Sequence, residues 1–205
     1  MRRSCLFSLP RALFVAVLAG FSPHSVALAQ TRGPVVPPPV APATIARDDH
    51  GQATIRAVRI DRPIQLDGRL DDEVYARTPP IDGFIQQEPQ EGALASENTQ
   101  VWVFFDDRNI YVSARCFDSH PEREVVTELR RDQNNITQNE SFTVVFDTFL
   151  DRRNGLFFQT TPIGALRDQA IVDDVLNSSW NTIWDVRTGK FDGGWTAEFA
   201  IPFKS

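Results

Sequence analysis

Residues 99–117 read TQVWVFFDDRNIYVSARCF, and this stretch decides the fold class. Apolar side chains occupy every second position from Val101 to Phe105, and Trp102 and Phe104 fall between them, which is the period of a β-strand. A polar DDRN turn follows, and the run after it alternates in the same way. Two alternating runs joined by a short polar turn are typical of a β-hairpin, so we predict one here.

The same pattern returns twice toward the C-terminus. ESFTVVFD, at 140–147, is followed by a DRRNG turn and the apolar run 156–158, and NTIWDVRTG, at 181–189, is followed by GWTAEFAIPF, at 194–203. Short strands at this spacing, with turn residues between them and almost no helical periodicity, indicate an all-β fold. We predict an antiparallel β-sandwich with one short helix near its start.

That helix is predicted within IQLDGRLDDEVY, residues 64–75. The Asp67-Gly68 pair is a turn signal, and Asp71 is placed to cap a helix whose first turn is acidic. Leu70 and Tyr75 have the spacing of a hydrophobic staple. The acids do not follow the pattern of a calcium loop of EF-hand type, so we interpret the stretch as a turn and a capped helix.

Two segments precede the domain. Residues 1–29 combine arginines, an apolar run and a small-residue cleavage site, which predicts a secretory signal peptide. Residues 30–53 are rich in proline and poor in large apolar side chains, so we predict a disordered tether. The domain is expected over residues 54–205.

Charge and cysteine content limit the partners. The formal net charge is −6, and removal of Arg2, Arg3 and Arg11 with the signal peptide would make it −9. An acidic exported protein is a poor electrostatic match for nucleic acid or for anionic lipid, so neither is expected as a partner. Cys116 alone would remain after cleavage, so no intramolecular disulfide is expected, and its place on a buried strand face favours packing over nucleophilic catalysis.

We expect no catalysis within this chain. Only His50 and His120 follow the signal peptide, and neither belongs to a zinc or serine-triad motif. Carboxylates are plentiful but are placed mostly at predicted turns and strand ends, where solvated acids are usual. They include Glu128, Asp132, Glu140, Asp147, Asp151, Asp168, Asp173, Asp174, Asp185 and Glu198.

Two further kinds of site are predicted. A structural calcium ion would suit an acidic protein without disulfides, and Asp118 and Asp147, each at a predicted strand end, are the candidate metal ligands. Aromatic rings can stack on sugars, and Trp180, in the polar segment NSSWNT, is the best exposed candidate. The other tryptophans are predicted to lie in the core; they are Trp102, Trp184 and Trp195.

The order of five motifs adds a resemblance. IQLDGRLDDEVY, TQVWVFFDDRNIYVSARCFD, NESFTVVFDT, GLFFQTTPIGALRDQ and GWTAEFAIPF together resemble the family 9 carbohydrate-binding modules, and most closely the variant at the N-terminus of large bacterial outer-membrane proteins. The resemblance runs from about Ile60 to Ser205. It implies a β-sandwich of immunoglobulin-like or jelly-roll type, often with calcium. Members in xylanases bind the reducing ends of cellulose and xylan between two tryptophans.

The sequence departs from the family at the binding positions. The segment NNITQN, at 134–139, stands where the first clamp tryptophan is expected, Thr143 stands for a binding glutamate and Gln159 for a binding arginine. The second clamp tryptophan would lie beyond Ser205, so either the chain is a fragment of a longer protein or the resemblance to the family fails at its C-terminal end. The ligand-binding candidates in this chain are Trp180, Gln159 and Glu140.

Three functional hypotheses remain open. The first is a non-catalytic, exported module that binds a poly- or oligosaccharide, such as xylan or cellulose ends, and serves carbohydrate catabolism. The second is an interaction or periplasmic domain of a larger outer-membrane protein, associated with its barrel and without sugar binding. The third is the N-terminal part of a glycoside hydrolase that cleaves O-glycosyl bonds with a catalytic domain elsewhere. The expected location is the periplasm, the outer membrane or the extracellular space.

Overall fold

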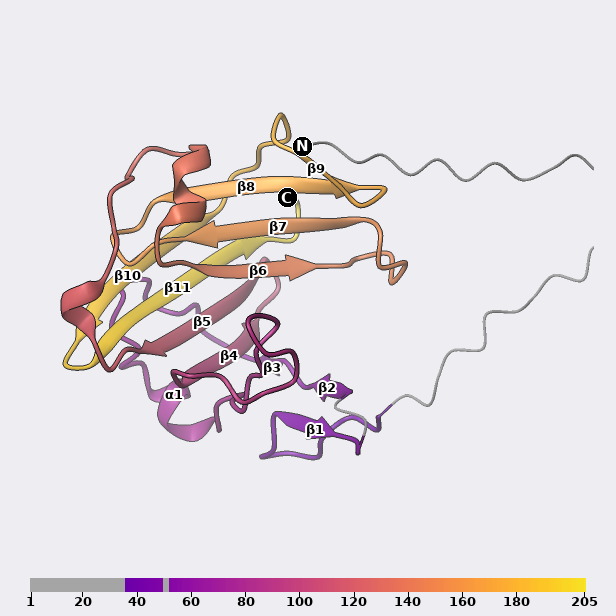
Figure 1. Cartoon of the computed structure of the whole chain (residues 1–205). Helices are drawn as coiled ribbons and strands as arrows, with labels where there is room; N and C mark the ends of the chain where they lie inside the picture. The colour runs from indigo at the N-terminus through magenta and orange to yellow at the C-terminus, as the bar shows by residue number, and fades with distance from the viewer. Residues whose placement is uncertain (1–35, 50–51) are drawn as a thin grey trace, which may run out of the picture. The chain divides into compact units, whose positions relative to one another are not determined.

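The structure is a computed structural model and describes residues 36–49 and 52–205 (Figure 1). The predicted signal peptide lies outside these residues. The elements in chain order are β1 (Ile45–Arg47), β2 (Ala53–Ile55), β3 (Val58–Arg59), α1 (Glu73–Arg77), β4 (Thr99–Phe105), β5 (Asn109–Phe117), the 3-10 turns η1 (Pro121–Arg123) and η2 (Asn134–Gln138), β6 (Phe142–Phe146), β7 (Gly155–Thr160), β8 (Leu166–Val172), β9 (Val175–Asn177), β10 (Asp185–Phe191) and β11 (Gly194–Pro202). Within the described ranges, no helix is long and apolar enough to cross a membrane.

A five-stranded sheet has the order β10-β11-β5-β4-β3. The predicted β4–β5 hairpin is confirmed, with Phe105 paired to Ile110 across the turn. Asp106 closes this turn, because its Oδ1 accepts hydrogen bonds from the backbone N–H groups of Arg108 (2.7 Å) and Asn109 (2.8 Å). The β10–β11 hairpin is also confirmed, and β3 runs parallel to β4.

A four-stranded antiparallel sheet has the order β6-β7-β8-β9. The predicted β6–β7 hairpin is confirmed. The sequence did not predict β8, because β8 places Asp168 on its inward face, opposite Phe158 of β7. A carboxylate at an inward position breaks the alternation of apolar and polar residues that marks a strand.

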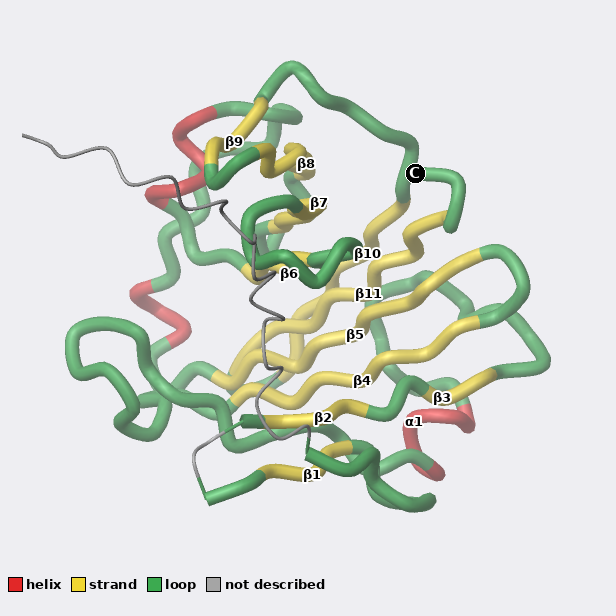
Figure 2. The backbone as a smooth tube through the Cα atoms, turned by 90° about the vertical axis from the view of Figure 1, so that its right-hand side faces the viewer, coloured by secondary structure: helices red, strands yellow, loops and turns green. Residues whose placement is uncertain are grey.

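The two sheets face each other across one hydrophobic core, and Figure 2 shows them as separate layers. Trp184 stacks on Phe199, with ring centroids 5.4 Å apart and planes 7° apart. Both sheets contribute buried side chains to this core, among them Val101, Val112, Phe158, Val186, Trp195 and Ile201. The arrangement confirms the predicted β-sandwich.

The opposite face of the five-stranded sheet is also covered. Tyr75 of α1 packs edge-on against Trp102 and Phe104 of β4, with both pairs of ring centroids 5.5 Å apart. This second cluster includes Ile60, Ile64, Leu70, Tyr111 and Ala200. The strand β4 is therefore buried on both faces, which explains its unbroken run of apolar residues.

The predicted helix is present as α1, but the predicted cap is wrong. Asp72, and not Asp71, precedes the first helical residue, and its side chain makes no capping hydrogen bond. Its carboxylate instead accepts a hydrogen bond from the backbone N–H of Gln65 (3.0 Å). The side chain of Asp72 therefore binds the turn that precedes the helix instead of the N–H groups of the first helical turn.

Part of the predicted tether is folded. Strand β1 lies inside the segment 30–53 and pairs with β2, so Ile45 faces Ile55. The hydroxyl of Thr44 donates a hydrogen bond to the carbonyl of Pro79 (3.1 Å), and Val36 is buried. Residues 36–49 are therefore packed against the sandwich, because β1 finds a partner strand that the proline content of the segment did not reveal.

Candidate functional site

Two of the predicted site residues, Glu140 and Asp118, line one cavity of about 450 Å³ at the end of the sandwich where β5 ends and β6 begins. Oε1 of Glu140 accepts a hydrogen bond from the indole N–H of Trp195 (2.6 Å). Burial raises the pKa of Glu140, and the nearby carboxylate of Asp118 raises it further. Burial also raises the pKa of the Cys116 thiol, to about 12, so this thiol is protonated near neutral pH and packs as predicted.

The two candidate metal ligands, Asp118 and Asp147, each hold a turn. Asp118 Oδ1 accepts a hydrogen bond from the backbone N–H of His120 (2.7 Å). The carboxylate of Asp147 accepts three from the β6–β7 loop, including that of Arg152 (2.7 Å). Within residues 36–49 and 52–205, no group of three or more histidine, cysteine or acidic side chains is placed to hold a metal ion. Calcium binding stays a prediction from the sequence.

The tryptophans divide as predicted, except at Trp180. Trp102, Trp184 and Trp195 are buried. Trp180 is half-buried and packs edge-on against Phe158, with ring centroids 6.2 Å apart. Its ring therefore contributes to the rim of the core.

Gln159 belongs to a different surface, the outer face of the four-stranded sheet. Because successive side chains of a strand point to opposite sides, the residues that alternate with the core side chains of this sheet share that face. The strand register pairs them across the sheet in two sets. One set is Thr143–Gln159–Arg167, the other is Val145–Phe157–Gln169, and we define these residues as the outer face.

Three side chains of the outer face are long, polar and buried: Gln159, Arg167 and Gln169, which we call the polar row. Gln159 Nε2 donates a hydrogen bond to the hydroxyl of Ser141 (3.0 Å), and its Oε1 accepts one from Nη1 of Arg167 (3.4 Å). The guanidinium of Arg167 lies 5.6 Å from the ring centroid of Phe157. Gln169 Oε1 is buried and has no hydrogen-bond partner among the described residues.

The loop from Thr127 to Asn139 lies at the end of the outer face where β8 begins (Figure 1). The backbone N–H of Asp132 in this loop donates a hydrogen bond to the carbonyl of Leu166 (2.9 Å). The loop contains η2, and its segment 134–139 is the one that stands in place of the family's first clamp tryptophan. The loop therefore contacts the first residues of β8, and it contains no aromatic residue.

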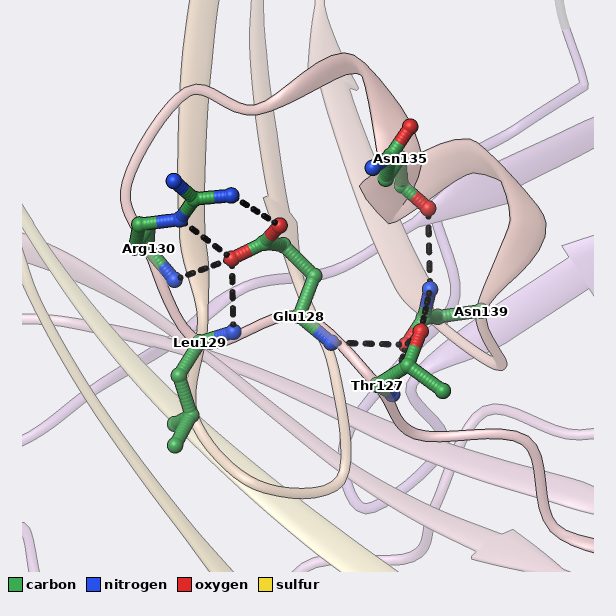
Figure 3. A network of polar contacts seen from close by, with 6 residues as sticks. All are labelled: Thr127, Glu128, Leu129, Arg130, Asn135 and Asn139. Atoms are coloured by element: carbon green, nitrogen blue, oxygen red, sulfur yellow. Dashed lines mark hydrogen bonds and ion pairs between the residues drawn. The ribbon is translucent and has the colours of Figure 1, made fainter.

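Side-chain hydrogen bonds hold this loop in place (Figure 3). Asn139 Oδ1 accepts hydrogen bonds from the backbone N–H groups of Thr127 (2.6 Å) and Glu128 (3.3 Å), and its Nδ2 donates one to the carbonyl of Asn135 (2.8 Å). The carboxylate of Glu128 accepts two hydrogen bonds from the guanidinium of Arg130, at 3.1 Å each. These charge-assisted bonds lower the pKa of Glu128 to about 2, so it is ionised near neutral pH.

The expectation that the acids lie at turns and strand ends is wrong for Asp168 and Glu198, which are both 1% exposed within strands. Asp168 accepts hydrogen bonds from the indole N–H of Trp184 (3.1 Å) and the backbone N–H of Thr182 (2.8 Å), and it pairs with Arg131. These contacts come from segments remote in sequence, so the local pattern did not show them. Both acids serve the structure.

Glu198 binds the backbone of the turn formed by the sequence LDG at 66–68. Its Oε2 accepts hydrogen bonds from the backbone N–H groups of Asp67 (3.0 Å) and Gly68 (2.7 Å), and its Oε1 accepts one from the hydroxyl of Tyr75 (2.8 Å). Burial raises the pKa of Glu198. The acidic stretch at 64–75 is therefore a turn held by a buried carboxylate of β11.

Sequence reasoning named Gln159 but missed Arg167 and Gln169. The only signal for them was strand register: once β8 is paired with β7, Arg167 lies opposite Gln159 and Gln169 lies opposite Phe157. The structure does not bring the three predicted ligand residues together. Gln159 lies on the outer face, Glu140 in the end cavity and Trp180 beside the core.

Comparisons with known proteins bear on the fold. No protein-family model matches the sequence, and no curated protein matches it. Among solved structures, a family 9 carbohydrate-binding module from Caldicellulosiruptor kristjanssonii in complex with cellotriose matches with a TM-score of 0.52 and 16% identity over 73% of this chain and 67% of that chain. The module in complex with glucose matches with a TM-score of 0.50 and 16% identity, over 73% and 69%. Over the matched residues the chain has the fold of the family 9 carbohydrate-binding modules.

Proposed function

We propose that this chain is a non-catalytic carbohydrate-binding module and that it binds an oligosaccharide on the outer face of the four-stranded sheet. The observation that carries the proposal is the unpaired Oε1 of Gln169, buried within a row of polar side chains on that face. An unpaired buried acceptor costs free energy, so such groups in native proteins call for an explanation. A ligand that donates a hydrogen bond would supply the missing partner.

The chemistry of the outer face suits a sugar. Glutamine amides both donate and accept hydrogen bonds, as sugar hydroxyls do, and a guanidinium donates several. Phe157 adds an apolar ring next to Gln169. A small number of fixed polar groups beside an aromatic ring is the usual composition of a small-molecule site. The related fold in complex with cellotriose or glucose supports a sugar as the ligand.

We extend the proposal to location and biological context. The predicted signal peptide supports export to the periplasm, the outer membrane or the extracellular space. Xylan or cellulose ends are the proposed polysaccharides, and carbohydrate catabolism is the proposed process. If a glycoside hydrolase domain is attached to this module, catalysis belongs to that domain.

A contact with another protein is a second candidate function, and one observation favours it. Phe149 and Leu150, in the β6–β7 loop, are each 76% exposed. Arg153 of the same loop pairs with Asp173 (3.1 Å) and Asp174 (3.5 Å) of the β8–β9 turn, beside which Val172 and Val175 are also exposed. Exposed apolar side chains that lie together suit a partner protein, such as an outer-membrane barrel.

Calorimetry tests the carbohydrate proposal. Titration of the chain with cellotriose and with xylotriose should give saturable heat, and Gln169→Leu should weaken binding roughly tenfold, the equivalent of about one hydrogen bond. Gln90→Leu, at an exposed position outside the outer face, is the matched control and should bind like the wild type. The absence of heat from every member of a neutral and acidic glycan panel, together with co-purification of a membrane protein, would favour the second candidate.

A further inference from the structure

Arg167 is the only arginine or lysine that is buried among the described residues, and no carboxylate lies within ion-pair distance of it there. Its guanidinium contacts Gln159 Oε1 and the ring of Phe157, and neither group carries a negative charge. A buried charge is costly unless it is paired with an opposite charge. The polar row therefore holds a cation that has no counter-charge among the described residues around it.

Two arginines in the loop between η1 and β6 have carboxylate partners. Arg131 pairs with both Asp132 and Asp168, and Arg130 pairs with Glu128. The chain is acidic overall, so carboxylates are not scarce. Arg115, half-buried on β5, also has no carboxylate partner among the described residues and contacts the rings of Trp102 and Phe191, so Arg167 differs from the other unpaired arginines in being buried.

We propose that Arg167 binds the carboxylate of an acidic sugar, so that the ligand is a uronic acid or an oligosaccharide that carries one. This inference rests on the proposed function and names its ligand class. A guanidinium matches a planar carboxylate with two parallel hydrogen bonds. Gln169 lies two residues further along β8, a backbone rise of about 6.6 Å, and its Oε1 accepts a hydrogen bond from a hydroxyl of the same ligand.

The surroundings of the polar row fit this ligand. Thr143 and Val145 are exposed on the adjacent strand β6, so the outer face opens to solvent on that side. Gln159 is held by Ser141, which fixes the amide next to the guanidinium. A carboxylate that enters from β6 would meet donors from both Gln159 and Arg167.

Calorimetry with matched ligand pairs tests the inference. The pairs are D-glucuronate with D-glucose, and xylotriose with or without a glucuronic acid substituent. We expect the acidic member of each pair to bind at least about tenfold more tightly, since hydrogen bonds to charged groups are the stronger class. The preference should weaken as the salt concentration rises. Arg167→Met should abolish the preference, and Arg62→Gln, at an exposed position, should keep it.

The same variant separates a ligand-binding role from a structural one. Removal of an unpaired buried charge should leave the thermal midpoint of unfolding of Arg167→Met at or above that of the wild type. A marked fall in the midpoint would assign Arg167 to the fold and overturn the inference.

Equal binding of neutral and acidic sugars would overturn the inference while the proposed function stands. Tighter binding of glucose 6-sulfate than of glucuronate would overturn the assignment to a carboxylate. No binding of any sugar would contradict the proposed function itself.

Discussion

Glu198 stabilises the fold through a single buried carboxylate. It joins the Asp67-Gly68 turn and the hydroxyl of Tyr75 to the five-stranded sheet, and the hydroxyl of Tyr75 also lies 2.8 Å from that of Ser113. Burial raises the pKa of both Glu198 and Tyr75. The chain therefore takes up a proton at Glu198 more readily in the folded state than in the unfolded state.

Linkage turns this pKa shift into a prediction. Because the folded pKa of Glu198 lies above its ordinary value of 4.5, its stabilising contribution is present below that pH and is lost as the pH rises through the folded pKa. Glu198→Gln keeps the shape of the side chain but does not titrate. We expect the wild type to lose free energy of unfolding relative to Glu198→Gln as the pH rises from about 4 to about 7.

Urea denaturation at several pH values measures this difference. Glu198→Ala serves as a control, because it loses the hydrogen bonds at every pH and should be destabilised by at least about 1–3 kcal/mol throughout. A difference between wild type and Glu198→Gln that does not change with pH would show that the pKa of Glu198 is the same in the folded and unfolded states, and would contradict the prediction.

At the scale of elements, the turn that precedes α1 packs directly on β10. A Cβ atom at Gly68 would lie 2.6 Å from the carbonyl carbon of Thr188, and one at Gly189 would lie 2.2 Å from the carbonyl oxygen of Gly68. Gly68 also has a φ of +83°, a conformation that side chains disfavour. Two backbone segments are thus in contact at a point where no side chain fits.

A pair of glycine substitutions separates the backbone strain of a positive φ from the overlap of an added Cβ atom with β10. Gly92 has a φ of +79°, and a Cβ atom there would have no neighbouring atom within 4 Å, so Gly92→Ala suffers only the backbone strain, about 1 kcal/mol. Gly68→Ala adds the overlap with Thr188 and should lose about 3 kcal/mol or more. Thermal denaturation of both variants compares them, and equal losses would mean that the turn moves away from β10 at little cost.

The three hairpins could be predicted from sequence because each is encoded locally. Alternating apolar residues on both sides of a polar turn specify β4–β5, β6–β7 and β10–β11 without knowledge of the rest of the chain. Strand β8 could not, since its inward Asp168 is satisfied by Trp184, Thr182 and Arg131 from other segments. The cap of α1 failed for the same reason, because Asp72 binds Gln65 outside the helix.

At the scale of the whole molecule, the fold was more predictable than the site. Strand period and motif order lead to the sandwich, and two solved structures of family 9 modules share its fold. The polar row depends on which strand pairs with β7 and on what is missing around Arg167 and Gln169. Neither the absence of a counter-charge nor an unpaired amide oxygen can be read from a sequence, because both are properties of the folded surroundings.

Two regions contain residues that the sequence named as ligand-binding candidates, the outer face with Gln159 and the end cavity with Glu140. The cavity is lined by several acids, including Glu97, Asp118 and Glu124, which disfavour an anionic sugar. The outer face instead offers a cation and amides. The position of bound sugar distinguishes the two regions.

Amide chemical-shift mapping by NMR, during titration with cellotriose and with glucuronate, locates the residues that contact the sugar. We predict that the largest changes fall on the outer face, at Thr143, Phe157, Gln159, Arg167 and Gln169, with smaller changes in the loop held by Asn139. Changes confined to the end cavity around Glu140, or no changes at high ligand concentration, would contradict a carbohydrate site on the four-stranded sheet.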